Sequence, residues 1–315
     1  MKNKLLKVSL VLTMLALLVA CGSQKPVTEE DGKVKVVASI FPMYEMAREI
    51  VGDRATVSLM VGSNEDAHHY EPSAQAVASV NDADIFLYSS DEMEFWVQSL
   101  LAVVENDELQ VVEVGEGIDF EIGADAHDHE ENEQDDHDEE HDHGGMDPHF
   151  WLSPQAMASQ LDRVVEALIA TDPEGAAVYT ENGERYAHEL LELHTAYEEA
   201  FADAENKIFV VQHQAFGHLA HEFHIEQVAV GGLATEVEPN PKQLVEIVNF
   251  VKDQNVPVIY YQSGENSAIA ETIANETNTE VAILYDLEGA PISEDDLTYM
   301  DAMYYNLEQL KKSIR

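Results

Sequence analysis

The chain has 315 residues, of which 45% are hydrophobic, and its 62 acidic against 16 basic residues give a formal net charge of −46. This length and hydrophobic content provide for one large domain or two ordinary ones, and they exclude disorder of the whole chain. The charge argues against binding to nucleic acid or to an anionic membrane surface, since phosphates would be repelled, and it suits the binding of cations.

The N-terminus has the pattern of an export signal. Three lysines precede the apolar run Val8–Ala20, which is 13 residues long, shorter than a membrane span and typical of a signal peptide. Small residues lead from it to Cys21, in a pattern that resembles a bacterial lipobox. The only cysteine of the chain is thus expected to carry a lipid, and an intramolecular disulfide is excluded. We expect a signal peptide over residues 1–20 and a polar tether over residues 21–32, which anchors an exported protein to the outer face of the cytoplasmic membrane.

Beyond the tether, strand and helix signals alternate. The first part of the chain predicts a strand, a helix, a strand, a helix and a strand, over residues 34–40, 42–51, 55–61, 72–81 and 84–88. Ser153 and Pro154 provide the N-cap and the first-turn proline of a further helix. The alternation resumes later, with predicted segments at residues 208–211, 216–223, 225–230, 241–254, 256–261, 269–276, 281–284 and 295–312. Such an order predicts an α/β fold with mainly parallel sheets.

A long helical stretch separates two regions of similar element order. It covers residues 173–204, where apolar positions recur among many charged ones. We therefore predict an N-terminal α/β lobe over residues 33–172, a linking helix over residues 173–204 and a C-terminal α/β lobe over residues 205–315.

One segment interrupts the N-terminal lobe. Residues 121–143 hold 12 acidic residues and five histidines, namely His127, His129, His137, His141 and His143. So little apolar surface predicts a disordered loop over residues 121–145. Imidazoles and carboxylates interleaved at short spacings favour low-affinity binding of zinc-like metals, although a solvated acidic linker with incidental histidines is an open alternative.

Three other histidines lie in ordered contexts. His68 lies between a predicted strand and a helix, His149 lies just before the Ser153 helix, and His213 directly follows a predicted strand. A single histidine in such a position is more commonly a hydrogen-bonding loop residue than a metal ligand. Because parallel sheets bind ligands at the carboxyl ends of their strands, the three imidazoles together predict a metal site that one anionic ligand would close.

The motifs around these histidines resemble those of a known family. They are Ser-Ile-Phe-Pro at residues 39–42, Asp-x-His-x-Tyr-Glu-Pro at 66–72, Asp-Pro-His-x-Trp-Leu at 147–152, His-x-Ala-Phe-Gly at 213–217 and Glu-x-Glu-Pro-x-Pro-x-Gln-Leu at 236–244. The chain resembles, over about residues 34–315, the metal-binding receptors of bacterial ABC importers. These are the cluster A-I zinc/manganese solute-binding lipoproteins, and the zinc receptors are the most similar. A histidine-rich acidic loop ahead of the second histidine motif is typical of that branch. The resemblance implies two α/β lobes joined by one rigid helix, with the metal in the cleft between them.

The resemblance also implies a ligand set. The corresponding positions of this sequence are His68, His149, His213 and Glu288. His69 occupies the variable position of the first motif, and Asp286 competes with Glu288 for the role of the acidic ligand.

Other positions depart from the family pattern or match no ligand of it. Ala67 replaces the usual proline before the first ligand, and Gln262 stands where relatives often have an acid. His218, His221 and His224 lie three apart in a predicted helix, where an additional site stays open. The two tryptophans, Trp96 and Trp151, are expected to pack in the core.

The function implied is that of an extracytoplasmic high-affinity zinc receptor. It would deliver Zn2+ to an ABC permease in the membrane, as a monomer and without nucleic acid. A manganese or iron receptor of the same fold is the alternative, and three imidazoles favour zinc over Mn2+. A zinc-dependent hydrolase with an open coordination position is a second alternative, but the sequence has no HExxH pattern, and we expect no enzyme. An adhesin has no sequence signal of its own.

Overall fold

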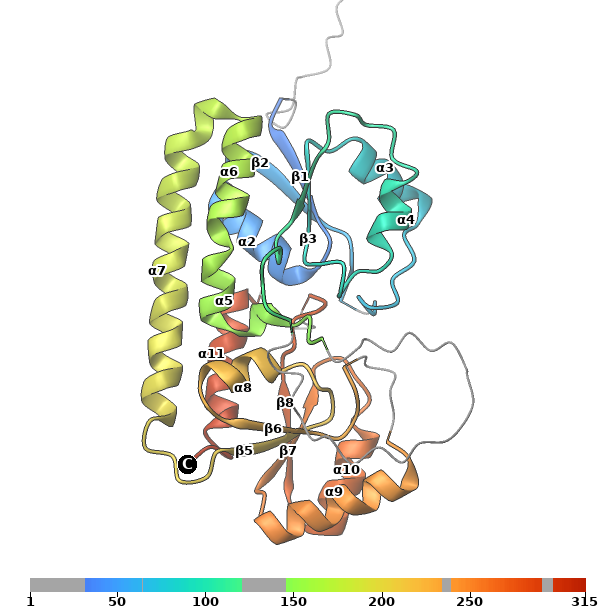
Figure 1. Cartoon of the computed structure of the whole chain (residues 1–315), viewed down its shortest axis with the longest axis vertical. Helices are drawn as coiled ribbons and strands as arrows, with labels where there is room; N and C mark the ends of the chain where they lie inside the picture. Colours follow the sequence, from blue (N-terminus) through green and yellow to red (C-terminus); the bar gives the residue numbers. More distant parts are fainter. Residues whose placement is uncertain (1–31, 64, 121–145, 234–238, 291–296) are drawn as a thin grey trace, which may run out of the picture. The chain divides into compact units, whose positions relative to one another are not determined.

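A computed structural model describes residues 32–63, 65–120, 146–233, 239–290 and 297–315 of the chain. The predicted signal peptide, Cys21 and the five histidines of the acidic loop lie outside these residues. From Val34 to Arg315 the chain forms one unit, which contains two α/β lobes (Figure 1). Two parallel sheets flanked by helices confirm the predicted fold class.

The N-terminal lobe is built on a four-stranded parallel sheet with the order β2-β1-β3-β4. The strands are β1 (Val34–Ala38), β2 (Ala55–Leu59), β3 (Ile85–Tyr88) and β4 (Gln110–Glu113), and the helices are α2 (Phe41–Val51), α3 (Ala74–Asn81) and α4 (Val97–Leu101). All four residues of β3 are buried, as expected for a central parallel strand covered on both faces. Figure 1 shows α3 and α4 on one side of this sheet and α2 on the other.

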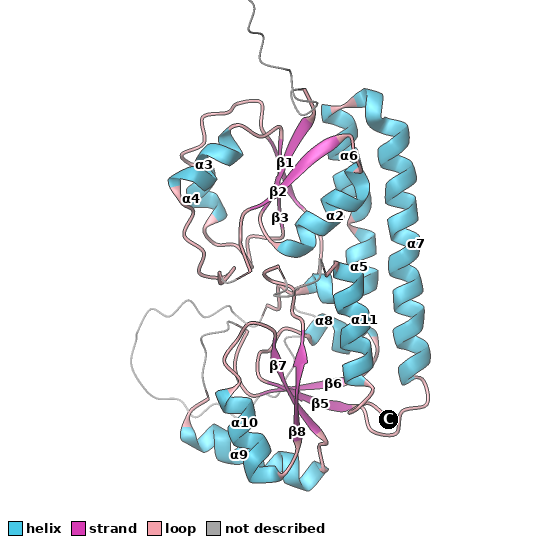
Figure 2. Cartoon of the chain, turned by 180° about the vertical axis from the view of Figure 1, so that it is seen from behind, coloured by secondary structure: helices cyan, strands magenta, loops and turns pink. Residues whose placement is uncertain are grey.

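A helical segment connects the lobes. It consists of the 3-10 turn η1 (Phe150–Leu152), α5 (Pro154–Ser159), α6 (Leu161–Thr171), the 3-10 turn η2 (Pro173–Gly175) and α7 (Ala176–Phe201). Ser153 caps α5 as predicted, since its hydroxyl accepts a hydrogen bond from the backbone N–H of Ala156. With 26 residues, α7 is about 39 Å long. It packs against α6 of the same segment, against α2 of the first lobe and against α11 of the second, so this long helix joins the lobes (Figure 2).

The C-terminal lobe repeats the arrangement with the order β6-β5-β7-β8, again all parallel. Its strands are β5 (Ile208–Val211), β6 (Glu226–Ala229), β7 (Val258–Gln262) and β8 (Glu280–Leu284), and its helices are α8 (Gly217–Glu222), α9 (Pro241–Gln254), α10 (Ala268–Thr277) and α11 (Tyr299–Leu310). Asn240 begins α9 with a reciprocal capping box that involves Gln243. The two lobes were predicted to have a similar order of elements along the chain. Their sheets also have the same strand order, since in each lobe the second strand lies at the edge beside the first.

The main hydrophobic core is continuous between the lobes. It contains buried residues of both sheets and the inner face of α7, with Tyr186 and Tyr197 among its largest side chains. A second cluster fills the space between the C-terminal sheet and its helices α9 and α10. Within the described residues, no helix has the combination of length and apolarity needed to cross a bilayer.

Candidate metal centre

Each of the four predicted ligands follows the carboxyl end of a parallel strand. His68 lies in the loop after β2, His149 ends the connection after β4, and His213 and Glu288 follow β5 and β8. Their ligand atoms all lie within 4.8 Å of one another. The loops of both sheets therefore contribute to one cluster.

The two Asp-x-His motifs use the same local turn. The carboxylate of Asp66 accepts a hydrogen bond from the backbone N–H of His68 at 2.8 Å, and Asp147 accepts one from His149 at 3.0 Å. Such aspartate turns are local structures that the spacing of the motif specifies directly. Each turn fixes the backbone of its histidine.

The carboxylate of Glu288 is the centre of the cluster. Its Oε1 atom lies 3.5 Å from Nε2 of His68, 3.0 Å from Nε2 of His149 and 3.6 Å from Nε2 of His213. In a tetrahedral zinc site with bonds of about 2.0–2.1 Å, neighbouring ligand atoms are about 3.3 Å apart. All four side chains are buried, with residue exposures of 5% or less. The spacing and the burial thus fit one metal ion of this size.

Two of the imidazoles have carboxylate partners on their second nitrogen. Nδ1 of His149 lies 2.7 Å from Oδ1 of Asp147, a residue with no exposed surface. Nδ1 of His213 lies 3.3 Å from Oδ2 of Asp286, and its Nε2 lies 2.8 Å from the carbonyl oxygen of Leu233. Carboxylates in this position orient a metal-binding imidazole and make it more basic.

The electrostatics of the cluster favour positive charge. Burial lowers the pKa of His149, but the hydrogen bonds and charges of Asp147 and Glu288 outweigh it and raise this pKa to about 10. Burial also lowers the pKa of His213, but the carboxylates of Glu288 and Asp286 outweigh this effect and raise the pKa above its usual value. For Glu288, burial is outweighed by the three imidazoles, which hold the pKa of its carboxyl well below the usual value. Burial and the charge of Glu288 raise the pKa of Asp286. Protons on the imidazoles therefore compete with a metal ion.

The other candidates lie elsewhere. The side chain of His69 is 53% exposed and contacts Asp66. Asp286 faces the outer nitrogen of His213 and is not part of the group of four. The predicted helix with three histidines is shorter than expected, because α8 ends at Glu222 and His224 has a positive φ.

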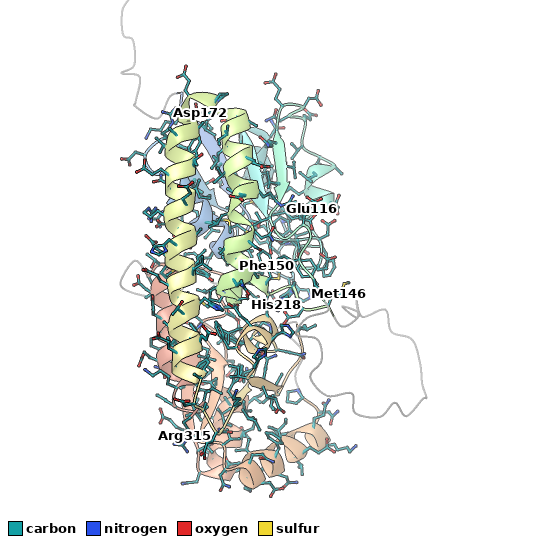
Figure 3. The ribbon with its side chains drawn as sticks, turned by 60° about the vertical axis from the view of Figure 1, so that its left-hand side comes forward. Glu116, Met146, Phe150, Asp172, His218 and Arg315 are labelled. Atoms are coloured by element: carbon teal, nitrogen blue, oxygen red, sulfur yellow. The ribbon has the colours of Figure 1, made fainter. Side chains whose placement is uncertain are left out.

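His218 is the buried member of those three histidines. Its Nε2 lies 2.8 Å from the backbone carbonyl oxygen of Asp147, and burial lowers its pKa. Figure 3 shows His218 just below Phe150, where the two lobes meet. It supports the second histidine motif, whereas His221 is exposed.

The sequence did not reveal the supporting roles of Asp147 and of the two tryptophans. For Asp147 a signal existed, because an aspartate lies two residues before the histidine in both motifs and could have suggested a hydrogen bond to it. The tryptophans are buried as expected, but both also donate hydrogen bonds next to predicted ligands. Trp96 donates to the carbonyl oxygen of Ala67 at 3.0 Å and Trp151 to that of Asp286 at 2.7 Å.

Comparison with known proteins gives the family. The sequence model described as ZnuA, zinc-uptake complex component A, periplasmic, matches residues 36–313. The zinc-binding lipoprotein AdcA of Streptococcus pneumoniae is 34% identical over 98% of this chain, which spans 61% of the length of that relative. The high-affinity zinc uptake system protein ZnuA of Bacillus subtilis is 35% identical over 95% of this chain and 94% of its own.

Solved structures agree with the sequence comparison. The Zn(II)-bound ZnuA-like domain of Streptococcus pneumoniae AdcA superposes with a TM-score of 0.74 at 31% identity, and the match covers 90% of this chain and 99% of that domain. The solved domain thus has the fold described above along nearly its whole length. Because the family model spans most of the sequence and both relatives are more than 30% identical to it, the chain belongs to the ZnuA family of zinc-uptake components, as its motifs predicted.

Proposed function

We propose that the chain is an extracytoplasmic zinc receptor that binds one Zn2+ tightly through four side chains, His68, His149, His213 and Glu288. The observation that carries the proposal is the set of three buried Nε2 atoms that lie 3.0–3.6 Å from Glu288 Oε1, close to the spacing of about 3.3 Å between ligands of a tetrahedral zinc site. Zinc is the cargo here and not a catalyst, since membership of an uptake family confirms that the chain is not an enzyme.

The donor set supports zinc over manganese or iron. Imidazole nitrogen suits zinc, whereas manganese prefers oxygen ligands, and three of the four donors are imidazoles. A closed set of four protein ligands, buried from solvent, also differs from a catalytic zinc site, which keeps one position for water.

Delivery to a membrane permease follows from the same proposal. The family name describes a component of a zinc-uptake complex, and the relatives AdcA and ZnuA are named for zinc binding and zinc uptake. The chain spans 61% of the length of AdcA, so we propose only metal binding and delivery, and no activity of the remaining part of that relative.

The sequence adds three further parts to the proposal. A lipid on Cys21 would anchor the monomer to the outer face of the membrane, and the tether would let it reach the permease. The two lobes would lie at residues 33–172 and 205–315, on either side of the linking helix. The histidines of residues 121–145 would collect zinc weakly near the tight site.

Metal competition tests the proposal. We expect the purified chain to retain one zinc ion against a chelator of known affinity and to prefer zinc over manganese at neutral pH. The variant His213→Asp exchanges one imidazole for a carboxylate and should narrow that preference, because oxygen donors favour manganese. Tight binding of manganese that zinc cannot displace from the unaltered chain would contradict the proposed function.

A further inference from the structure

The turn that carries Glu288 contains an unusual backbone conformation. Leu287 has a φ of 67° although its side chain is large and buried, with 2% exposure. The other described non-glycine residues with positive φ, His224, Asn255 and Asn278, each lie at the C-terminal end of a helix, where this conformation is common. Leu287 lies at no helix end, and for a bulky residue the left-handed region is strained.

The turn at Leu287 directs two neighbouring carboxylates to the imidazole cluster. Glu288 Oε1 lies 3.0 Å from Nε2 of His149, and Asp286 Oδ2 lies 3.3 Å from Nδ1 of His213. A residue held in a rare conformation must be fixed by its surroundings, because the chain would otherwise relax to a more common one. The contacts that fix this turn therefore also fix the fourth ligand.

Those contacts come from two sides. The indole N–H of Trp151 donates a hydrogen bond of 2.7 Å to the backbone carbonyl of Asp286, directly before the strained residue. Asn306 of α11 forms two hydrogen bonds with the backbone of Tyr285, at 2.8 Å to its N–H and 2.7 Å to its carbonyl oxygen. Both Trp151 and Asn306 are fully buried.

Trp151 is itself held and belongs to the motif of another ligand. Its own carbonyl oxygen accepts a hydrogen bond of 2.6 Å from the hydroxyl of Tyr299. Its ring lies edge-on to that of His149, two residues earlier, with a centroid distance of 5.3 Å. One side chain therefore links the loop of the second histidine to the loop of the acidic ligand.

We propose that Trp151 is a positioning residue for the metal site: its indole N–H holds the strained turn at Leu287 and so keeps the carboxylate of Glu288 directed at the three imidazoles. This proposal rests on the proposed zinc-binding function. Without the hydrogen bond the turn relaxes, Glu288 withdraws, and water takes its place on the metal.

Trp151→Phe tests this role, since it removes the N–H and keeps an aromatic ring. Tyr197→Phe is the matched control, because it removes a buried 2.7 Å hydrogen bond from the Tyr197 hydroxyl to the backbone carbonyl of Met303, away from the ligands. We expect Trp151→Phe to weaken zinc binding by about 10- to 100-fold, as for other groups that orient ligands. Tyr197→Phe should leave the affinity within about twofold of the unaltered chain. The visible spectrum of the cobalt-loaded chain should lose its tetrahedral intensity in Trp151→Phe alone.

A second pair of variants tests the strained turn at Leu287. If Trp151→Phe does not fold, this pair alone tests whether the turn positions Glu288. Leu287→Ile keeps the volume but places a β-branched residue at positive φ, where it is least tolerated. The control Leu284→Ile makes the same change at a buried position in strand β8, where β-branched residues are favoured. We expect the first variant to lose zinc affinity and the tetrahedral cobalt spectrum, and the second to keep both.

The outcomes separate this proposal from the one on which it rests. An unaltered chain without tight zinc binding or a tetrahedral cobalt spectrum refutes the proposed function. If that chain binds as expected, equal affinities and spectra for Leu287→Ile and Leu284→Ile overturn the positioning role. A folded Trp151→Phe that matches Tyr197→Phe in both measurements overturns it as well.

Discussion

Two adjacent histidines provide a sharp test of the ligand assignment. The structure buries His68 with its Nε2 3.5 Å from Glu288 Oε1, whereas the side chain of His69 is 53% exposed and lies 3.2 Å from a carboxylate oxygen of Asp66. Changing each histidine to alanine therefore removes the same group from neighbouring positions. We expect His68→Ala to lose tight zinc binding and His69→Ala to keep it.

The expected size follows from general zinc energetics. Four-ligand structural zinc sites bind with about 10–16 kcal/mol, so one ligand corresponds to about 2.5–4 kcal/mol. Since about 1.4 kcal/mol is a factor of ten, His68→Ala should weaken zinc binding by on the order of 100- to 1,000-fold. His69 contributes no ligand in this assignment, and its exposed pair with Asp66 is worth at most about 1 kcal/mol of stability.

Two measurements read out this difference. Competition against a zinc chelator of known affinity, on the chain without its signal segment, gives the affinities. Thermal unfolding with excess zinc gives an independent value, because a 100-fold weaker site loses about 2.7 kcal/mol of zinc-dependent stabilisation. In a chain of this size that loss reduces the zinc-induced rise in Tm by about 4–5 °C. An effect of His69→Ala equal to or larger than that of His68→Ala would refute the assignment.

Three further predictions follow from the site and the N-terminal segments. Zinc binding should weaken by about 100-fold between pH 8 and pH 6, because carboxylates raise the pKa of His149 to about 10 and zinc must displace that proton. Calorimetry in buffers of different ionisation enthalpy should detect proton release at pH 7, and its absence would contradict this reasoning. Deleting residues 125–143 should reduce the zinc stoichiometry to about one and leave the tightest site intact, since loop sites must order the chain when they bind. Loss of the tightest site on this deletion would show that the loop supplies its ligands. Cys21→Ala should release the protein from membranes without changing zinc affinity, and a variant that still fractionates with membranes after signal removal would exclude the lipid anchor.

Local sequence determined much of the secondary structure. The predicted strand at residues 208–211 and helix at residues 241–254 have the bounds of β5 and α9, since β-branched runs, an asparagine cap and a first-turn proline act over a few residues. The Asp-x-His turns at His68 and His149 are local in the same sense. These features depend on neighbouring residues, so they can be predicted from a single sequence.

The edge strand β4 shows where local signals fail. Its four residues, Gln110–Glu113, are polar at both ends, and no strand was predicted there. Pairing with β3 makes it a strand, in parallel register with residues 25 positions earlier in the chain. Such a strand is specified by its neighbour in the sheet and not by its own composition.

The metal centre likewise combines both levels. The sequence determined which residue types could bind zinc and nominated Glu288 and Asp286 as alternatives two residues apart. The tertiary structure distinguishes their positions: Glu288 Oε1 lies 3.0–3.6 Å from the three Nε2 atoms, whereas Asp286 Oδ2 faces the outer nitrogen of His213, and Leu287 between them has a positive φ. Ligand chemistry is a property of each side chain, but a site whose members are up to 220 residues apart exists only where two parallel sheets bring the ends of their strands together.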